Sequence, residues 1–243
     1  MLWSTVAIAL LVAVTAVAGI HWPATYAKET PYSRAGAIAS DLVDLFLVVP
    51  VLLISGIKGY RGSVPARLVW LGVQGYLLYN FVLYAMGVHF NALAFVYWAT
   101  LSLCFYSTVF SVPLLPVAQI AQAYGPRAPR KTTAIVFLAL ALPSAALDLR
   151  EDIAALAAGQ APPSAIAMNQ PVVFFHVLDL VFFLPALCVT AILLFRRKDA
   201  AFALAPALLA LLVMMNVELA AIVAVMMREI GRASCRERVS GIV

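Results

Sequence analysis

Acidic side chains within long apolar segments are the residues of this sequence best suited to chemistry. Asp41, Asp44, Asp179 and Glu218 all lie inside such segments. A carboxylate at the centre of a bilayer costs about 2.5–3.5 kcal/mol on insertion scales, so these residues seldom face lipid and commonly mark ion, proton or substrate sites. We therefore interpret the four carboxyl groups as candidates for a functional site inside a helical bundle.

The spacing of these residues along the chain places them in pairs. Asp41 and Asp44 are three residues apart, as are His176 and Asp179, which puts both members of each pair on one face of a helix. Two neighbouring carboxyl groups can share protons, and a histidine titrates near neutral pH. Both pairs thus suit the binding of a proton or a small solute.

We predict one polar pocket, facing outward, in which residues from several helices meet. Its expected members are Asp41, Asp44, Asn80, His176, Asp179 and Glu218. His89 and Glu151 are expected near its mouth. On the last apolar segment Glu218 rather than Asn216 should point inward, because a carboxylate is costlier to expose to lipid than an amide.

A metal site is an alternative interpretation of some of the same residues. Its ligands would be His89, His176, Asp179 and Asp44. Imidazole and carboxylate groups bind zinc, which activates water for hydrolysis of a lipid or another amphiphile. This layout resembles the seven-helix zinc hydrolases related to ceramidases and adiponectin receptors, which also place the N-terminus inside. The present sequence lacks their paired histidines on the last helix.

Simpler interpretations stand beside these functional ones. Asp41 and Asp44 would form a solvated helix end if the second span began after Asp44. Independently of this, His176 and Asp179 would form a structural hydrogen-bonded pair. A third class of function, a non-catalytic membrane assembly subunit, would use the pocket only as internal polarity and would tolerate substitutions in it.

The composition places these residues in a membrane protein. Of the 243 residues, 65% are hydrophobic and 11% are charged, whereas soluble domains have about 45–50% apolar and about 25% charged residues. The apolar residues form blocks of the roughly 20 residues that a bilayer-spanning helix needs. We predict an all-α membrane protein, a bundle of seven transmembrane helices in contact with the lipid bilayer, whose oligomeric state the sequence leaves open.

Seven apolar segments define the expected spans. They cover residues 2–20, 37–57, 67–87, 91–112, 132–149, 171–195 and 201–227. The fifth is the shortest and ends in an acidic stretch from Asp148 to Asp152. The first is interpreted as a retained helix rather than a cleaved signal, because it lacks a positive region at its start. No internal repeat is evident along the seven segments.

Basic residues predict the orientation of these spans, because cytoplasmic loops carry an excess of lysine and arginine. The connections after the second, fourth and sixth spans hold such residues, namely Lys58, Arg61, Arg67, Arg127, Arg130, Lys131, Arg196, Arg197 and Lys198. The other connections have few or balanced charges. We therefore expect a cytoplasmic N-terminus and a C-terminus outside.

The chain divides into one transmembrane domain, residues 1–230, and a short tail, residues 231–243. The tail resembles translated adapter or vector sequence and is interpreted as non-native.

Four prolines, Pro50, Pro143, Pro185 and Pro206, fall inside expected spans. Each removes a backbone hydrogen bond there and is expected to kink its helix.

Missing residue types exclude several functions. A retinal protein needs a lysine in its last helix. The lysines here lie in loops or at span ends, namely Lys28, Lys58, Lys131 and Lys198. We therefore expect no retinal cofactor. The sequence has no nucleotide-binding or hydrolase motif. It also has no basic, aromatic module for nucleic acid, so we expect no nucleic-acid partner.

Residues of the second to fourth spans resemble an uncharacterised family of bacterial integral membrane proteins. The similarity rests on Asp41 to Pro50, Arg61 to Trp70, Tyr76 to Gly87, and Phe90 with Asn91. The resemblance implies a multi-pass protein of the bacterial inner membrane and brings no activity with it. From the residues we predict small-solute or proton binding and transport, with the zinc-dependent hydrolase as the alternative.

Overall fold

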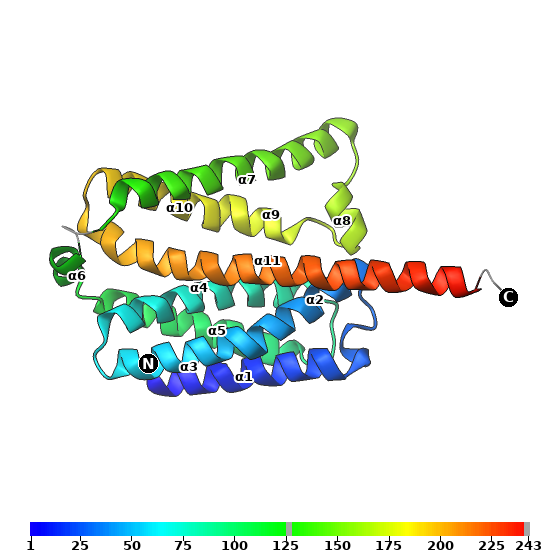
Figure 1. Cartoon of the computed structure of the whole chain (residues 1–243), viewed down its shortest axis with the longest axis horizontal. Helices are drawn as coiled ribbons and strands as arrows, with labels where there is room; N and C mark the ends of the chain where they lie inside the picture. Colours follow the sequence, from blue (N-terminus) through cyan, green and yellow to red (C-terminus); the bar gives the residue numbers. More distant parts are fainter. Residues whose placement is uncertain (125–127, 241–243) are drawn as a thin grey trace.

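Seven helical segments are long and apolar enough to cross a membrane, in a computed structural model that describes residues 1–124 and 128–240 (Figure 1). They are Leu2–His21, Pro31–Tyr60, Val64–Gly87, Ala94–Leu114, Arg130–Ala158, Phe174–Phe195 and Asp199–Arg228. The described residues form helices and no strands. The prediction of an all-helical protein with seven apolar, membrane-length helices is confirmed, and the orientation of its termini stays a prediction.

The first four spans comprise a set of helices with short connecting turns. In order these are α1 (Leu2–His21), η1 (Pro23–Tyr26), α2 (Pro31–Val43), η2 (Asp44–Val48), α3 (Val49–Tyr60), α4 (Val64–Gly87), α5 (Ala94–Ser111) and η3 (Val112–Leu114). The α2, η2 and α3 segments follow one another without a gap and form the second span.

The rest of the chain adds three further spans and two short helices. In order the elements are α6 (Val117–Tyr124), α7 (Arg130–Ala158), α8 (Pro163–Met168), α9 (Phe174–Leu178), η4 (Asp179–Phe183), α10 (Leu184–Phe195) and α11 (Asp199–Ser240). Residues 231–240 of the tail continue α11, and residues 241–243 lie outside the described part of the chain. That the tail is non-native stays a prediction.

Local sequence signals set where several helices begin and end. Thr30 caps α2, its hydroxyl accepting the Ser33 N–H at 3.2 Å, and a proline follows at the first helical position. Ser63 caps α4 in the same way. Helix α7 ends at Gly159, whose φ of 62° lies in the left-handed region that favours glycine.

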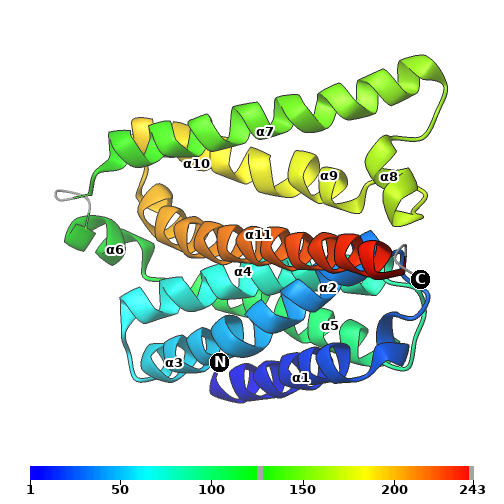
Figure 2. The ribbon, with the colours of Figure 1, turned by 45° about the vertical axis from the view of Figure 1, so that its right-hand side comes forward.

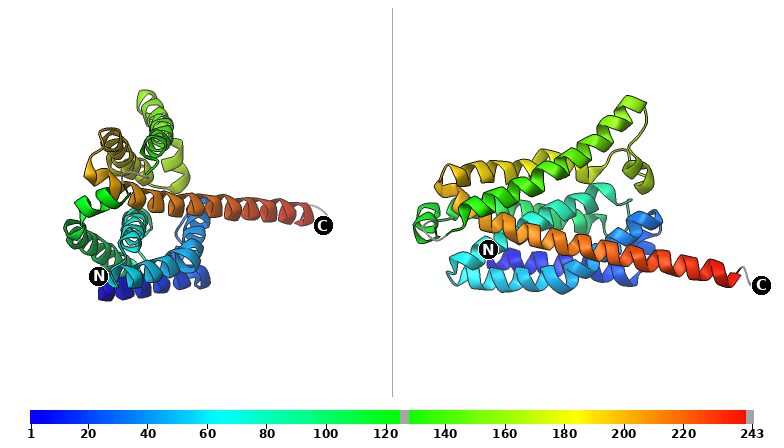
Figure 3. Two further views of the ribbon diagram at one scale, coloured as in Figure 1. Left: turned by 60° about the vertical axis from the view of Figure 1, so that its left-hand side comes forward. Right: turned by 45° about the horizontal axis from the view of Figure 1, so that its top comes forward.

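Helices α4 and α11 lie at the centre of the bundle. On one side of α11 are α1 to α5, and on the other are α7, α9 and α10, as the views in Figures 1 and 2 agree. Seen from other directions, α11 still separates these two groups (Figure 3). Gly72 allows the close approach of α4 to α11, because a Cβ there would overlap the Ala207 carbonyl oxygen.

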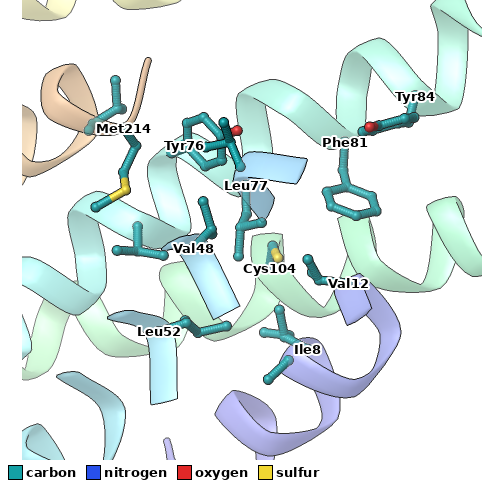
Figure 4. Close-up of a cluster of buried hydrophobic side chains, with 14 of the residues drawn as sticks. Ile8, Val12, Val48, Leu52, Tyr76, Leu77, Phe81, Tyr84, Cys104 and Met214 are labelled. Carbon is teal, nitrogen blue, oxygen red and sulfur yellow. The ribbon is translucent and has the colours of Figure 1, made fainter. Parts of the chain in front are cut away.

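Two apolar cores hold these groups together. The larger core joins α1, η2, α3, α4 and α5, and Figure 4 shows Ile8, Leu52, Leu77 and Cys104 meeting within it. The second core joins α7 and α10 to α11 through side chains that include Phe137. Both cores therefore depend on residues far apart in the sequence.

The structure corrects two expectations about the spans. The fifth span was expected to be the shortest, but α7 runs for 29 residues and continues through the acidic stretch that was expected to end it. Tryptophan is enriched at membrane–water interfaces, which predicts an interfacial position for Trp70 near the start of the third span. It is instead fully buried, and its indole N–H donates to the Thr5 hydroxyl at 2.9 Å.

Candidate functional site

A cluster of buried carboxyl groups lies where α2 and η2 meet α4 and α11. Asp41 is fully buried, and its two oxygens accept hydrogen bonds from the hydroxyls of Tyr26 (2.7 Å) and Tyr84 (2.8 Å). Burial, with a further contribution from Asp41, raises the pKa of Tyr26 well above its ordinary value. Tyr26 therefore stays protonated and acts as a donor to Asp41.

The backbone of α1 makes room for the Asp41 side chain. A Cβ at Gly19 would overlap the Asp41 carboxyl group and would also press on the Tyr26 hydroxyl. A glycine at this position thus lets the carboxyl group pack directly against the helix.

Asp44 lies one turn further along and faces α4. Its Oδ1 accepts the Tyr76 hydroxyl at 3.0 Å, and its Oδ2 accepts the Asn80 amide at 3.1 Å. Tyr76 and Asn80 are four residues apart, so both side chains project from the same face of α4. Asp44 is 1% exposed. The interpretation of Asp41 and Asp44 as a solvated helix end is therefore wrong.

Glu218 joins the same cluster from α11. Its carboxyl group accepts a hydrogen bond from the hydroxyl of Ser40, the residue beside Asp41, and 9% of its surface is exposed. Asn216 is exposed on the opposite face and binds the carbonyl of Leu212 in its own helix. The prediction that Glu218 points inward is confirmed.

The three carboxyl groups of this cluster have hydroxyl and amide partners only. Among the described residues the ion pairs all involve histidine, and none joins Asp41, Asp44 or Glu218 to a lysine or arginine. Isolated buried charges are very costly, so buried ionisable groups are either paired or neutral. The cluster therefore requires protons or a bound cation for neutrality.

His176 and Asp179 belong to a second cluster, between α9, η4 and α7. His176 is buried and lies between two carboxylates of α7, with Nδ1 3.1 Å from Asp152 Oδ1 and Nε2 3.5 Å from Asp148 Oδ1. Asp148 and Asp152 are one helical turn apart, which lets a single imidazole contact both. The closest partners of His176 are thus on α7, and sequence reasoning had not included them in the site.

Tyr79 connects this second cluster to the centre of the bundle. Its hydroxyl lies near the Asp179 carboxyl group, and its ring packs edge-on against Phe183 at 6.4 Å between centroids. Tyr79 follows Tyr76 by three residues on α4. The predicted single pocket is therefore two polar clusters, and both of them contact α4.

The remaining predicted residues lie at one end of the bundle. His89 contacts Glu29, with 3.0 Å between Nδ1 and Oε1. Glu151 accepts the backbone N–H and the hydroxyl of Ser164 at the start of α8. The four ligands of the zinc alternative, His89, His176, Asp179 and Asp44, do not come together. Among the described residues, no group of three or more His, Cys, Asp or Glu side chains is arranged to hold a metal ion.

A cavity of about 200 Å³ opens beside Glu218. It lies between α2, α4, α9 and α11, and Met168 and Gln170, at and after the end of α8, also line it. Its polar lining includes Glu29, Ser40, Asn80, Gln170 and Glu218. The first cluster thus borders a space large enough for a small ligand.

The two acidic clusters share a feature that the sequence had not revealed. The residues from Asp44 to Pro50 and from Asp179 to Pro185 have the same pattern, Asp-Leu, four apolar residues and proline. In each, five residues that begin with the aspartate form a π-helical turn, η2 or η4. The N–H before the proline bonds the aspartate carbonyl five residues back in both segments.

The proline supplies the physical reason for these two turns. It lacks an N–H, and its ring would clash with the carbonyl of the residue four positions earlier in a regular α-helix. Widening the helix by one residue removes that clash, and such π-bulges are frequent at functional sites. The Asp-Leu-x4-Pro pattern was therefore the sequence signal for both broken helices.

Comparisons of the chain with protein-family models, with curated proteins and with solved structures find no match.

Proposed function

We propose that this protein binds and transports a small solute or protons at the cavity beside Glu218. The observation that carries the proposal is the burial of Asp41, Asp44 and Glu218 with neutral partners only. The net charge of these carboxyl groups becomes less negative when they bind a proton or a cation. Ionisable residues inside membrane-spanning helices commonly belong to proton relays and to ion or substrate pathways.

The two broken helices support movement as well as binding. Each has a π-helical turn before a proline, and each places an aspartate next to α4. Transporters commonly place their sites at helices interrupted in corresponding positions. The proposal also includes the bacterial inner membrane as location, with the cavity at the outer end of the bundle.

The test is the protonation state of Glu218 in the full chain, reconstituted in lipid nanodiscs. Infrared absorption of protonated carboxyl groups is measured at pH 7, where an exposed carboxyl group would be ionised. We expect a protonated-carboxyl band in the unmodified protein, a smaller band in Glu218→Gln, and no change in Asp199→Asn. Asp199 is an exposed acid at the start of α11 and so provides the matched control.

Two results would overturn the proposal. One is the absence of the band at pH 7 in protein free of added cationic ligand, which would leave the carboxyl groups ionised without a partner. The other is unchanged proton flux into dye-loaded proteoliposomes when Glu218 or Asp44 is replaced by its amide. Tolerance of both substitutions would favour the assembly-subunit alternative.

A further inference from the structure

The walls of the cavity beside Glu218 are mostly apolar and partly aromatic. Phe174 and Phe175 contribute from α9, Leu83 from α4, and Ile222 from α11. Aromatic faces attract cations that lie over them, and apolar walls favour a ligand with a hydrocarbon body. The cavity therefore suits an amphiphilic ligand better than a strongly hydrated ion.

The charged side chains that line this cavity are both acidic. Glu29 already contacts His89 through its Oε1, which also accepts the His89 backbone N–H at 2.7 Å. Glu218 has the Ser40 hydroxyl as a partner and no basic residue. No lysine or arginine lines the cavity among the described residues. An anionic ligand would thus meet only negative charge there.

We propose that the cavity binds a small organic ammonium ion, with the cationic head at Glu218 and the apolar body against Phe174 and Phe175. This inference rests on the proposed function and names the class of solute. An ammonium group supplies the positive charge that the buried carboxylate lacks. It also donates hydrogen bonds to that carboxylate, which makes the contact charge-assisted and strong.

Gly36 gives a way to fill this cavity without disturbing the fold. It lines the cavity from α2, and a Cβ placed there would meet no atom within 4 Å. A large side chain at position 36 should therefore enter the cavity, whereas alanine should only add a methyl group. The pair Gly36→Phe and Gly36→Ala separates occlusion from any effect of losing the glycine.

The experiment uses three probes of similar shape: phenethylammonium, 2-phenylethanol and phenylacetate. Their binding to the full chain in phosphatidylglycerol nanodiscs is measured by titration calorimetry. We expect the ammonium probe to bind more tightly than the other two. Glu218→Gln should weaken it by about 10- to 100-fold, the range expected for a hydrogen bond to a charged group. Gly36→Phe should abolish binding, and Asp199→Asn and Gly36→Ala should leave it unchanged.

Several results would overturn the inference. Equal binding of the neutral alcohol would mean an apolar cavity without charge recognition. Unchanged ammonium binding in Gly36→Phe would place the ligand elsewhere, and this variant keeps the test valid if Glu218→Gln does not fold. Absence of binding by the ammonium probe, together with a protonated-carboxyl band at pH 7, would reject the ammonium ligand and leave the proposed proton function intact.

Two sources could supply the ammonium group: a free amine or the headgroup of an aminophospholipid. Adding phosphatidylethanolamine to the nanodiscs distinguishes them. Loss of probe binding in these nanodiscs would assign the cavity to the lipid headgroup, and retained binding would assign it to a free amine. Either result supports recognition of an ammonium group at Glu218.

Discussion

At the scale of single residues, the three buried carboxyl groups differ in the side chains that donate hydrogen bonds to them. Asp41 has two tyrosine hydroxyls, Asp44 a tyrosine and an amide, and Glu218 a serine. Of these three residues Glu218 lines the cavity, and Asp41 and Asp44 do not. Glu218 is therefore the carboxyl group that a ligand in the cavity can contact directly.

The hydrogen bonds of Asp41 lead to a prediction about stability. Asp41→Ala leaves the hydroxyls of Tyr26 and Tyr84 buried near the missing carboxyl group, and each buried unpaired group costs about 1–3 kcal/mol. We expect a lower free energy of unfolding in detergent, measured by denaturant titration. Asp41→Asn keeps one acceptor oxygen, so its free energy of unfolding should decrease less than that of Asp41→Ala.

The matched control for this prediction is Asp199→Asn, at an exposed position. It should leave the unfolding free energy within the ±0.5 kcal/mol or so that is usual for surface substitutions. Equal stability of Asp41→Ala and Asp41→Asn would contradict the assigned hydrogen bonds.

At the scale of elements, two π-helical turns place the acidic residues. In each broken helix the widened turn begins at the aspartate and ends two residues before the proline. Replacing Pro50 by alanine restores the missing N–H and removes the ring clash, which favours a regular α-helix. Removing one residue from the widened turn would rotate Asp44 by about 100° relative to the helix that follows.

This argument predicts the effect of Pro50→Ala on backbone hydrogen exchange. We expect slower exchange of the amides from residues 45 to 49, because regular α-helical hydrogen bonds replace those of the π-turn. Pro185→Ala should act in the same way on residues 180 to 184. Hydrogen–deuterium exchange with mass spectrometry measures both.

Pro143→Ala is the control, since Pro143 lies inside α7 without a π-helical turn. It should leave exchange in the two broken helices unchanged. Unaltered exchange in Pro50→Ala and Pro185→Ala would show that the prolines do not cause the turns.

At the scale of the whole molecule, the connections between helices gather at two ends of the bundle. The chain begins at one end and α11 runs out at the other (Figure 1). The residues around α8 and the turn that carries His89 share an end with the cavity. Under the orientation predicted from the basic loops, this is the outer end.

Cysteine labelling tests that orientation. We expect a cysteine at position 160, after α7, to react with an impermeant reagent added outside intact cells. A cysteine at position 128, before α7, should not react. Both are placed in a chain whose Cys235 has been replaced by serine, so that the tail does not react. Labelling at 128 but not at 160 would reverse the orientation and put the cavity at the inner end.

The sequence by itself determined the number of apolar, membrane-length helices. It also determined that Glu218, whose carboxyl group is costly to expose to lipid, points into the bundle. Apolar segment length set the seven spans, and the cost of exposing a carboxylate to lipid predicted that Glu218 faces inward. Proline also marked both broken helices, although the shared Asp-Leu-x4-Pro pattern became meaningful only with the two π-helical turns. These features depend on local chemistry and on the bilayer alone.

The tertiary structure decided which polar residues meet. His176 was expected to pair with Asp179 on its own helix, yet it lies between Asp148 and Asp152 of α7. Helical spacing gives only the face on which a side chain lies. The partner across that face depends on how neighbouring helices rotate and approach, as at Gly72 and Gly19. For that reason the residues of one predicted pocket lie in two clusters.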